Sequence, residues 1–248
     1  MKRVEMKKLL IYVFLSCLLP LSAAASGPGM TEKLVYDLTW AGIKTGTATL
    51  ENRDEQETTR IVSTAQSADW VSFFFTVDDR IEATLSKPRT TGGIGAPLKY
   101  RIRLREGRHK RNKEVVFDNG RHRAFFTDYI TGEKKEIGIR DNIFDPLSSL
   151  YYIRTLKVEV GKPVYVDVID NKKLWKVEVQ VLRKERVSTR LGNFDTIVIK
   201  PLLKSEGIFN KRGDMYIWLT DDLKRIPVKM QTKVAVGKVT AVLTGGLY

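Results

Sequence analysis

The sequence predicts a mainly β protein, a large curved antiparallel sheet forming a barrel or half-barrel, with one or two short helices as lids over its open face. Segments that alternate apolar and polar residues, as half-buried strands do, recur along most of the chain. Most are joined by short turns carrying Gly, Asn or Asp, and such links favour antiparallel neighbours. About a dozen strands in one chain must curl or stack, and a curled sheet leaves the fewest exposed edges.

The strands are expected in order along the chain. Residues 34–40 and 47–50 form the first hairpin, around a turn bracketed by Gly42 and Gly46. The later strands are expected at residues 77–85, 98–105, 113–117, 121–129, 134–139, 164–169, 174–187, 194–203, 215–219 and 226–243. Gly237, in the middle of the last segment, indicates a bulge, a sharp bend or a further turn. No shift in composition marks a domain boundary, so we expect a single β-rich domain over residues 26–248.

Residues 145–154 interrupt the strand pattern and predict a helix of about three turns. Asp145 stands where a helix N-cap belongs, and Pro146 occupies the first helical position. Leu147, Leu150 and Tyr151 share one face of this helix. That face is expected to lie over the opening of the curled sheet.

Residues 69–75 predict a second, shorter helix, which is apolar on nearly all sides. Its aromatic residues either line the mouth of an apolar cavity or fill the end of the sheet as ordinary core. In the first interpretation, a ligand-binding lid is formed by residues of both helices: Trp70, Phe73, Phe74, Leu147, Leu150 and Tyr151.

The first 25 residues have the pattern of a secretory signal peptide. Four Lys or Arg residues precede an apolar run at residues 9–15, and small side chains at Ala23 and Ala25 fit the pockets of signal peptidase. We therefore expect cleavage between Ala25 and Ser26, and export to the periplasm.

A lipoprotein signal would use Cys17 instead, but the preceding Phe-Leu-Ser is a poor approach to a lipidated cysteine. Cleavage after residue 25 leaves 223 residues with a net charge of +11 and no cysteine. Disulfides, thiolate metal sites and thiol catalysis are then impossible. No later segment has the roughly 18 uncharged apolar residues of a membrane-spanning helix. We expect a protein that is soluble or at most peripheral to a membrane.

One expected strand carries a ladder of basic side chains on a single face, about 6.7 Å apart: Lys99, Arg101, Arg103 and Arg105. The ladder is either an anion-binding surface or a solvated face balanced by acids of neighbouring strands. The first interpretation suits an anionic membrane, the phosphates of lipopolysaccharide or an acidic partner. Nucleic acid also suits the charge, but export makes it an unsuitable partner.

The sequence does not assemble a recognisable catalytic or metal site. The paired acids at 78–79 and 221–222 would point to opposite faces of a strand, and each pair suits turns or salt bridges better than acid–base catalysis. No Gly-x-Ser-x-Gly motif is present, and His109 and His122 cannot hold zinc without further ligands. We therefore expect no enzyme, no metal and no cofactor. A hydrolase that uses Asp221 or Asp222 is the least favoured alternative.

Three stretches carry a family resemblance: residues 32–46, residues 145–154, and residues 216–222 with 225–230 and Gly237, where Trp-Leu-Thr-Asp-Asp is followed by Arg-Ile-Pro-Val. They resemble an uncharacterised family of exported bacterial proteins, domain of unknown function 3108 (DUF3108). The resemblance spans nearly the whole chain after the signal peptide. It implies an envelope location and a β-rich fold, and it supplies no catalytic residues.

The leading hypothesis is a non-enzymatic periplasmic protein that binds or chaperones an apolar or amphiphilic envelope component, such as a lipid or lipoprotein. Curved-sheet carriers of the bacterial envelope offer an analogy at the level of the fold. The alternative is an envelope scaffold that recognises an anionic partner through the basic strand face. A cavity beneath the helices would distinguish the two hypotheses.

Overall fold

The computed structural model describes residues 30–89, 93–170, 172–202, 214–233 and 237–248. The predicted signal peptide, Cys17 and the cleavage site lie outside the described residues. The first strands are β1 (Met30–Trp40), β2 (Ile43–Asp54), β3 (Thr58–Ser67), β4 (Asp78–Ser86), β5 (Pro97–Glu106), β6 (His109–Asp118), β7 (Arg123–Asp128) and β8 (Lys134–Gly138). The others are β9 (Ile143–Phe144), β10 (Val164–Asp170), β11 (Lys173–Thr189), β12 (Gly192–Leu202), β13 (Met215–Thr220), β14 (Pro227–Lys233) and β15 (Lys238–Leu247).

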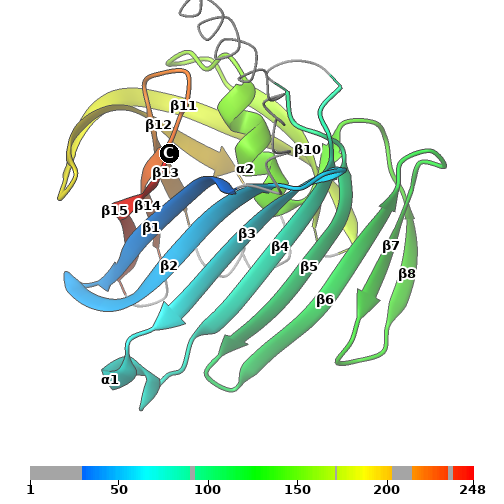
Figure 1. Cartoon of the computed structure of the whole chain (residues 1–248), viewed down its shortest axis with the longest axis horizontal. Coiled ribbons are helices and arrows are strands. Elements are labelled where there is room, and N and C mark those ends of the chain that lie inside the picture. Colours follow the sequence, from blue (N-terminus) through cyan, green and yellow to red (C-terminus); the bar gives the residue numbers. More distant parts are fainter. Residues whose placement is uncertain (1–29, 90–92, 171, 203–213, 234–236) are drawn as a thin grey trace, which may run out of the picture.

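All of these strands belong to one sheet of 15 strands, in the order β8-β7-β6-β5-β4-β3-β2-β1-β15-β14-β13-β12-β11-β10-β9. Neighbours in sequence pair as antiparallel hairpins, and β1 pairs antiparallel with β15, which brings the two ends of the described chain together. Only the short pair of β9 and β10 is parallel. The sheet is strongly curved and does not close, with β8 and β9 as its two edge strands (Figure 1). The large curved antiparallel sheet predicted from the sequence is thereby confirmed.

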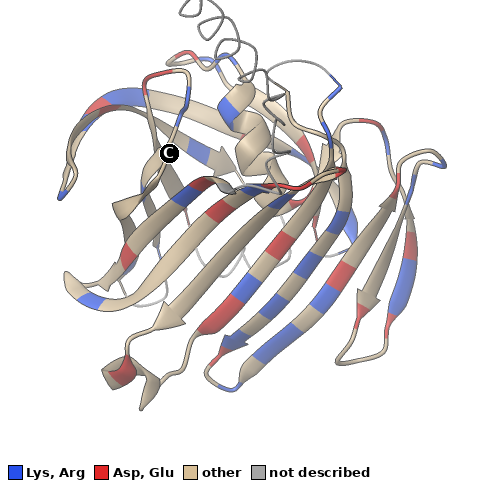
Figure 2. Ribbon diagram, viewed as in Figure 1, with Lys and Arg blue, Asp and Glu red and all other residues tan. Residues whose placement is uncertain are grey.

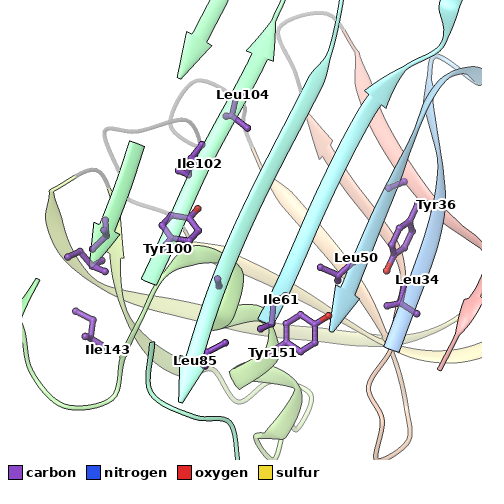
Figure 3. Packing of buried hydrophobic residues seen from close by; sticks show 14 of the residues in the cluster. Leu34, Tyr36, Leu50, Ile61, Leu85, Tyr100, Ile102, Leu104, Ile143 and Tyr151 are labelled. Atoms are coloured by element: carbon purple, nitrogen blue, oxygen red, sulfur yellow. The ribbon is translucent and has the colours of Figure 1, made fainter. Parts of the chain in front are cut away.

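Alternation along the strands places the core on the inner face of the curl. In β5, Tyr100, Ile102 and Leu104 are buried, whereas the basic residues between them face outward. Equivalent positions of the neighbouring strands supply Leu34, Tyr36, Leu50, Ile61 and Leu85, which line the inside of the sheet (Figure 3).

The helix α2 (Pro146–Thr155) forms as the N-cap pattern predicts. The Asp145 carboxylate accepts hydrogen bonds from the backbone N–H groups of Leu147 and Ser148, both at 2.9 Å, and from the Ser148 hydroxyl at 2.6 Å. Tyr151 and Ile153 are buried against the sheet. The helix therefore lies inside one end of the curl (Figure 1).

The helix α1 (Asp69–Ser72) is a single turn in the connection between β3 and β4. It lies at the end of the sheet opposite α2, so the two helices do not cover one opening (Figure 1). The topology gives the reason. The hairpin of β3 and β4 turns at one rim of the sheet, whereas α2 packs near the other ends of the same strands. We call these the α1 rim and the α2 rim.

Several of the expected strands require correction. The strands β3 and β9 were not expected at all, and β2 extends well beyond residues 47–50. The segment 226–243 divides into β14 and β15, which pair with each other, and Gly237 adopts a positive φ of 83° between them. The further turn was thus the correct alternative for this glycine.

Candidate functional site

A pocket of about 480 Å³ opens at the α2 rim. This volume lies in the range of sites that bind small molecules. Two segments and one further residue line the pocket. The first segment is the end of α2 with the residues that follow it, the second is the turn between β13 and β14, and the further residue is Ile94. The lining residues of the first two are Tyr151, Arg154, Thr155, Leu156, Lys157, Leu223, Lys224 and Arg225.

An ion pair between Arg154 and Glu32 holds one wall of this pocket in place. Two guanidinium nitrogens of Arg154 donate to the two Glu32 carboxylate oxygens, at 2.8 and 2.6 Å. The same guanidinium donates to the carbonyl oxygen of Lys224 at 3.1 Å. The Tyr151 hydroxyl also donates to Glu32, at 3.1 Å. The first strand, α2 and the β13–β14 turn are thereby joined at one point.

Burial strengthens this network. The side chains of Arg154 and Glu32 are only 10% and 12% exposed. Burial by itself would lower the pKa of Arg154, but the hydrogen bond and the charge of Glu32 outweigh it, and the net pKa is raised. Next to the pair, the Tyr36 hydroxyl donates to the Pro227 carbonyl at 2.8 Å, and burial raises the pKa of Tyr36 above its ordinary value. Arg154 is therefore committed to Glu32 and serves to position the wall.

Asp222 shapes the turn between β13 and β14. Its carboxylate accepts hydrogen bonds from the Thr220 hydroxyl at 2.7 Å and from the backbone N–H groups of Lys224 and Arg225 at 3.0 and 2.9 Å. Partial burial alone would raise the pKa of Asp222, but these hydrogen bonds lower it. Asp221 instead forms an ion pair with Lys184 at 2.6 Å. These contacts agree with the structural interpretation of the acid pair.

The pocket offers two cations together with apolar walls. Within the described residues, the side chains of Lys224 and Arg225 make no hydrogen bond or ion pair, although Lys224 is close enough to Asp222 to lower the pKa of that carboxyl. Lys157 is paired with Glu159 at 2.7 Å. The apolar contribution comes from the side chains of Ile94, Leu156 and Leu223. This combination suits an amphiphile with an anionic head group.

The six residues of the predicted lid lie at two different ends of the sheet, three on α2 and three in or next to α1. Tyr151 is buried and borders the pocket, whereas Leu147 and Leu150 pack partly buried against the core. The remaining three, Trp70, Phe73 and Phe74, lie on the opposite rim with 54%, 84% and 81% of their surface exposed. They neither fill the core nor approach α2, because a turn of the β3–β4 hairpin carries them past the end of the sheet.

The basic ladder of β5 lies on the outer face of the sheet, as predicted, but acids of both neighbouring strands oppose it. Glu114 of β6 is bonded to Lys99 and Arg101 at 2.8 and 3.0 Å. Glu82 of β4 is bonded to Arg103 at 2.9 Å. Red segments consequently interrupt the blue ones across β4, β5 and β6 (Figure 2).

These contacts lower the pKa of the Glu114 carboxyl, because nearby cations stabilise its charged form. Partial burial would raise the pKa of Glu114, but hydrogen bonds from Lys99, Tyr129 and Arg101 lower it below the ordinary value. Arg105 differs from the rest of the ladder, because only its backbone N–H is bonded to an acid, Asp79, at 3.1 Å. A shallow hollow of about 280 Å³ lies between these side chains. The ladder is therefore a mixed surface in which two carboxylates reduce the positive charge.

In the described part of the chain, no three His, Cys, Asp or Glu side chains lie close enough together to hold a metal ion. None of the helices in it is long and apolar enough to cross a membrane.

The residues that build the pocket were mostly missed from the sequence. Glu32, Lys224 and Arg225 were not singled out as candidates, and Arg154 was considered only as a helix residue. Glu32, Arg154 and Arg225 share one signal, since they lie in the stretches that carry the family resemblance, and these stretches meet at this pocket. Lys224 lies outside those stretches and has no such signal.

The open curled sheet with a helix inside one end defines a β-barrel-like protein. A crystal structure described as a β-barrel-like protein of domain of unknown function DUF1849 from Brucella abortus is similar, with a TM-score of 0.55 and 13% sequence identity. The likeness covers 89% of this chain and 97% of the other, and at this identity it concerns the fold alone.

The chain belongs to the family described as "Protein of unknown function (DUF3108)", which matches residues 35–244. The family resemblance seen in the sequence is thereby confirmed. No curated protein matches the chain.

Proposed function

We propose that this protein is a non-enzymatic component of the bacterial cell envelope that binds an amphiphilic molecule in the pocket at the α2 rim. The observation that carries this proposal is the pocket of about 480 Å³, in which apolar walls adjoin two cations without ion-pair partners among the described residues. A lipid, or the acylated end of a lipoprotein, has the matching chemistry.

The two parts of such a ligand have separate places. An acyl chain would lie against Ile94, Leu156 and Leu223, whose apolar surface leaves water when it is covered. A phosphate or carboxylate head group would be bound by Lys224 and Arg225. The ion pair between Arg154 and Glu32 keeps the wall in position before the ligand arrives, which lowers the cost of ordering the site.

The proposed location is the periplasm, and it rests on the secretory pattern of residues 1–25. A periplasmic protein meets lipids and lipoproteins in transit between membranes. The proposed ligand class and the proposed location therefore support each other.

The alternative is a scaffold that recognises an anionic partner through Lys99, Arg101, Arg103 and Arg105. It has less support, because three of these four cations already form ion pairs with Glu82 or Glu114. A partner would have to compete with these ion pairs, whereas a ligand of the α2 rim would not have to displace Lys224 or Arg225 from ion pairs seen in the described residues.

Titration calorimetry with lysophosphatidylglycerol, kept below its micellar concentration, tests the proposed function. We expect one ligand to bind per chain, and lysophosphatidylcholine, whose head group has no net charge, to bind more weakly. Reversing one charge with Lys224→Glu should weaken binding of the anionic lipid by roughly 10- to 100-fold, the worth of a charge-assisted hydrogen bond. Thr155→Trp, at an exposed position of the pocket wall, should block binding of both lipids.

The matched control is Lys134→Glu on β8, because Lys134 is likewise exposed and has no ion pair in the described structure. This variant should bind like the wild type. Equal affinity of the wild type, Lys224→Glu and Thr155→Trp would show that the pocket is not the binding site.

A further inference from the structure

Four consecutive or nearly consecutive aromatic residues project from the α1 rim. Trp70, Phe73, Phe74 and Phe75 are 54%, 84%, 81% and 50% exposed, and we call them the aromatic tip. The rings of Phe73 and Phe74 pack edge to face, with centroids 5.0 Å apart. Single exposed apolar residues are ordinary on protein surfaces, but a contiguous group marks an interaction surface.

The aromatic tip is held in place by its neighbours. The backbone N–H of Ala68 donates to the Thr45 carbonyl at 2.8 Å, and the Ser67 and Ser72 hydroxyls are 2.7 Å apart. On the other side, the Gly107 N–H donates to the Thr76 carbonyl at 2.7 Å. A Cβ at Gly107 would come within 2.7 Å of the Phe75 ring, so this ring lies directly on the backbone of the β5–β6 turn. These contacts fix the position of the aromatic tip relative to the sheet.

The surroundings of the aromatic tip add apolar and charged side chains. Trp40, the last residue of β1, and Ile43, the first residue of β2, are 44% and 60% exposed, and β2 adjoins α1 through Thr45. In and after the turn under Phe75, Arg108 and Lys110 are exposed and have no ion-pair partner among the described residues. Acids lie at this rim as well: Asp69 in α1, Asp78 and Asp79 at the start of β4, and Glu106 at the end of β5.

This composition and shape fit a bilayer surface. Aromatic side chains prefer the interface between water and hydrocarbon, and Lys or Arg residues beside them are attracted to anionic head groups. The connection that carries the tip projects beyond the ends of β3 and β4 (Figure 1), so the tip can enter a soft lipid surface, whereas a protein partner would need a preformed groove to receive it.

We propose that the aromatic tip inserts into the interfacial layer of an anionic lipid bilayer, with Arg108 and Lys110 in contact with the head groups. The protein is thereby attached to the membrane as a peripheral protein by its α1 rim. This surface adjoins the end of the basic ladder, where Arg105 pairs with Lys110, but it is separate from the pocket at the α2 rim, so the inference goes beyond the proposed ligand site.

Cosedimentation with vesicles tests this inference, using protein purified after export. Vesicles of phosphatidylethanolamine and phosphatidylglycerol should bind the protein, and vesicles of phosphatidylcholine should bind it less. Phe73→Ser combined with Phe74→Ser should lower the partition coefficient on the anionic vesicles at least tenfold, because two large apolar rings no longer insert. The folded state should be unaffected, since both rings are exposed.

The matched control is Leu191→Ser, which removes an apolar side chain that is 41% exposed in the turn between β11 and β12. It should bind within twofold of the wild type. Brominated lipids should quench the fluorescence of the wild type, and most of that quenching should disappear in Trp70→Phe. Reversing the charge of Arg108 and Lys110 to Glu should weaken binding to the anionic vesicles and reduce its salt dependence.

The inference is overturned if the wild type does not bind the vesicles, if the double Phe variant binds as well as the wild type, or if Trp70 is not quenched. The double Phe variant should still bind lysophosphatidylglycerol in calorimetry, because the pocket lies at the other rim. Failure of this proposal is therefore distinct from failure of the proposed function.

Discussion

The ion pair between Arg154 and Glu32 should contribute strongly to stability, and Arg154→Met tests this. Methionine keeps much of the volume and the apolar stem of arginine but removes the guanidinium. Glu32 would then be left 12% exposed, with the Tyr151 hydroxyl as its remaining side-chain donor. The carbonyl oxygen of Lys224 would also lose its side-chain donor.

The expected cost follows from this burial. Breaking a buried ion pair by removing one partner costs about 3–5 kcal/mol, because the other charge stays behind without compensation. For a domain of this size, each kcal/mol lowers the melting temperature by roughly 2–4 °C, so Arg154→Met should lower it by roughly 6–20 °C. Replacing both residues, with Glu32→Gln and Arg154→Met, should cost less than Arg154→Met alone, since no unpaired charge remains.

Urea denaturation of the wild type, the two single variants and the double variant measures the coupling between the two residues. Arg123→Met is the matched control, because its ion pair with Glu136 is about half exposed on both sides. Exposed pairs contribute at most about 1 kcal/mol. The reasoning is refuted if Arg154→Met costs no more than Arg123→Met, or if the costs of the two single changes at Glu32 and Arg154 simply add.

Three further predictions concern other parts of the chain. Burial raises the pKa of Asp145 from 3.8 to about 6, so the folded state binds this proton more tightly than the unfolded chain does. The ionised carboxylate therefore opposes folding by up to about 3 kcal/mol above pH 6, and this cost disappears below pH 4, where the group is protonated in both states. Asp145→Asn, which keeps an N-cap acceptor, should therefore gain stability relative to the wild type as pH rises from 4 to 7 in urea titrations, and a difference independent of pH contradicts this. A Cβ at Gly46 would overlap the carbonyl oxygen of Gln66 on the neighbouring strand, so Gly46→Ala should cost about 1–3 kcal/mol in the same assay, whereas Gly138→Ala meets nothing within 4 Å and should cost less. N-terminal sequencing of the exported protein should begin at Ser26, and a mature protein that begins at an acylated Cys17 would refute both the cleavage site and the expectation of a soluble protein.

Local patterns were sufficient to predict most of the elements. The alternation of buried and exposed residues in β5 follows directly from the pleat, and the N-cap of α2 follows from Asp145 and Pro146. The strand β3 was missed because its sequence, TTRIVSTAQS, has few apolar residues and no regular alternation. It forms nevertheless, because β2 and β4 pair with it on both sides.

The candidate sites depend on contacts that local patterns do not contain. Glu32 and Arg154 are separated by 122 residues in sequence. Glu82 and Glu114 oppose the basic ladder only because the strand register places both of them beside Arg101. The rim to which each helix belongs likewise depends on the sheet order, so the sequence could indicate aromatic and apolar helix faces but not that they lie at opposite ends.

The distance between the two rims restricts how the proposed activities can be combined. The strand β5 has 10 residues, and at about 3.4 Å per residue it spans about 30 Å, the thickness of a bilayer's hydrocarbon core. When the aromatic tip is in the membrane, the pocket at the α2 rim is therefore directed away from that bilayer. A lipid still embedded in the same bilayer cannot reach Lys224 or Arg225. The ligand must already have left the membrane, as a monomer or on another protein. Vesicles that bind the aromatic tip should consequently not compete with lysophosphatidylglycerol for the pocket.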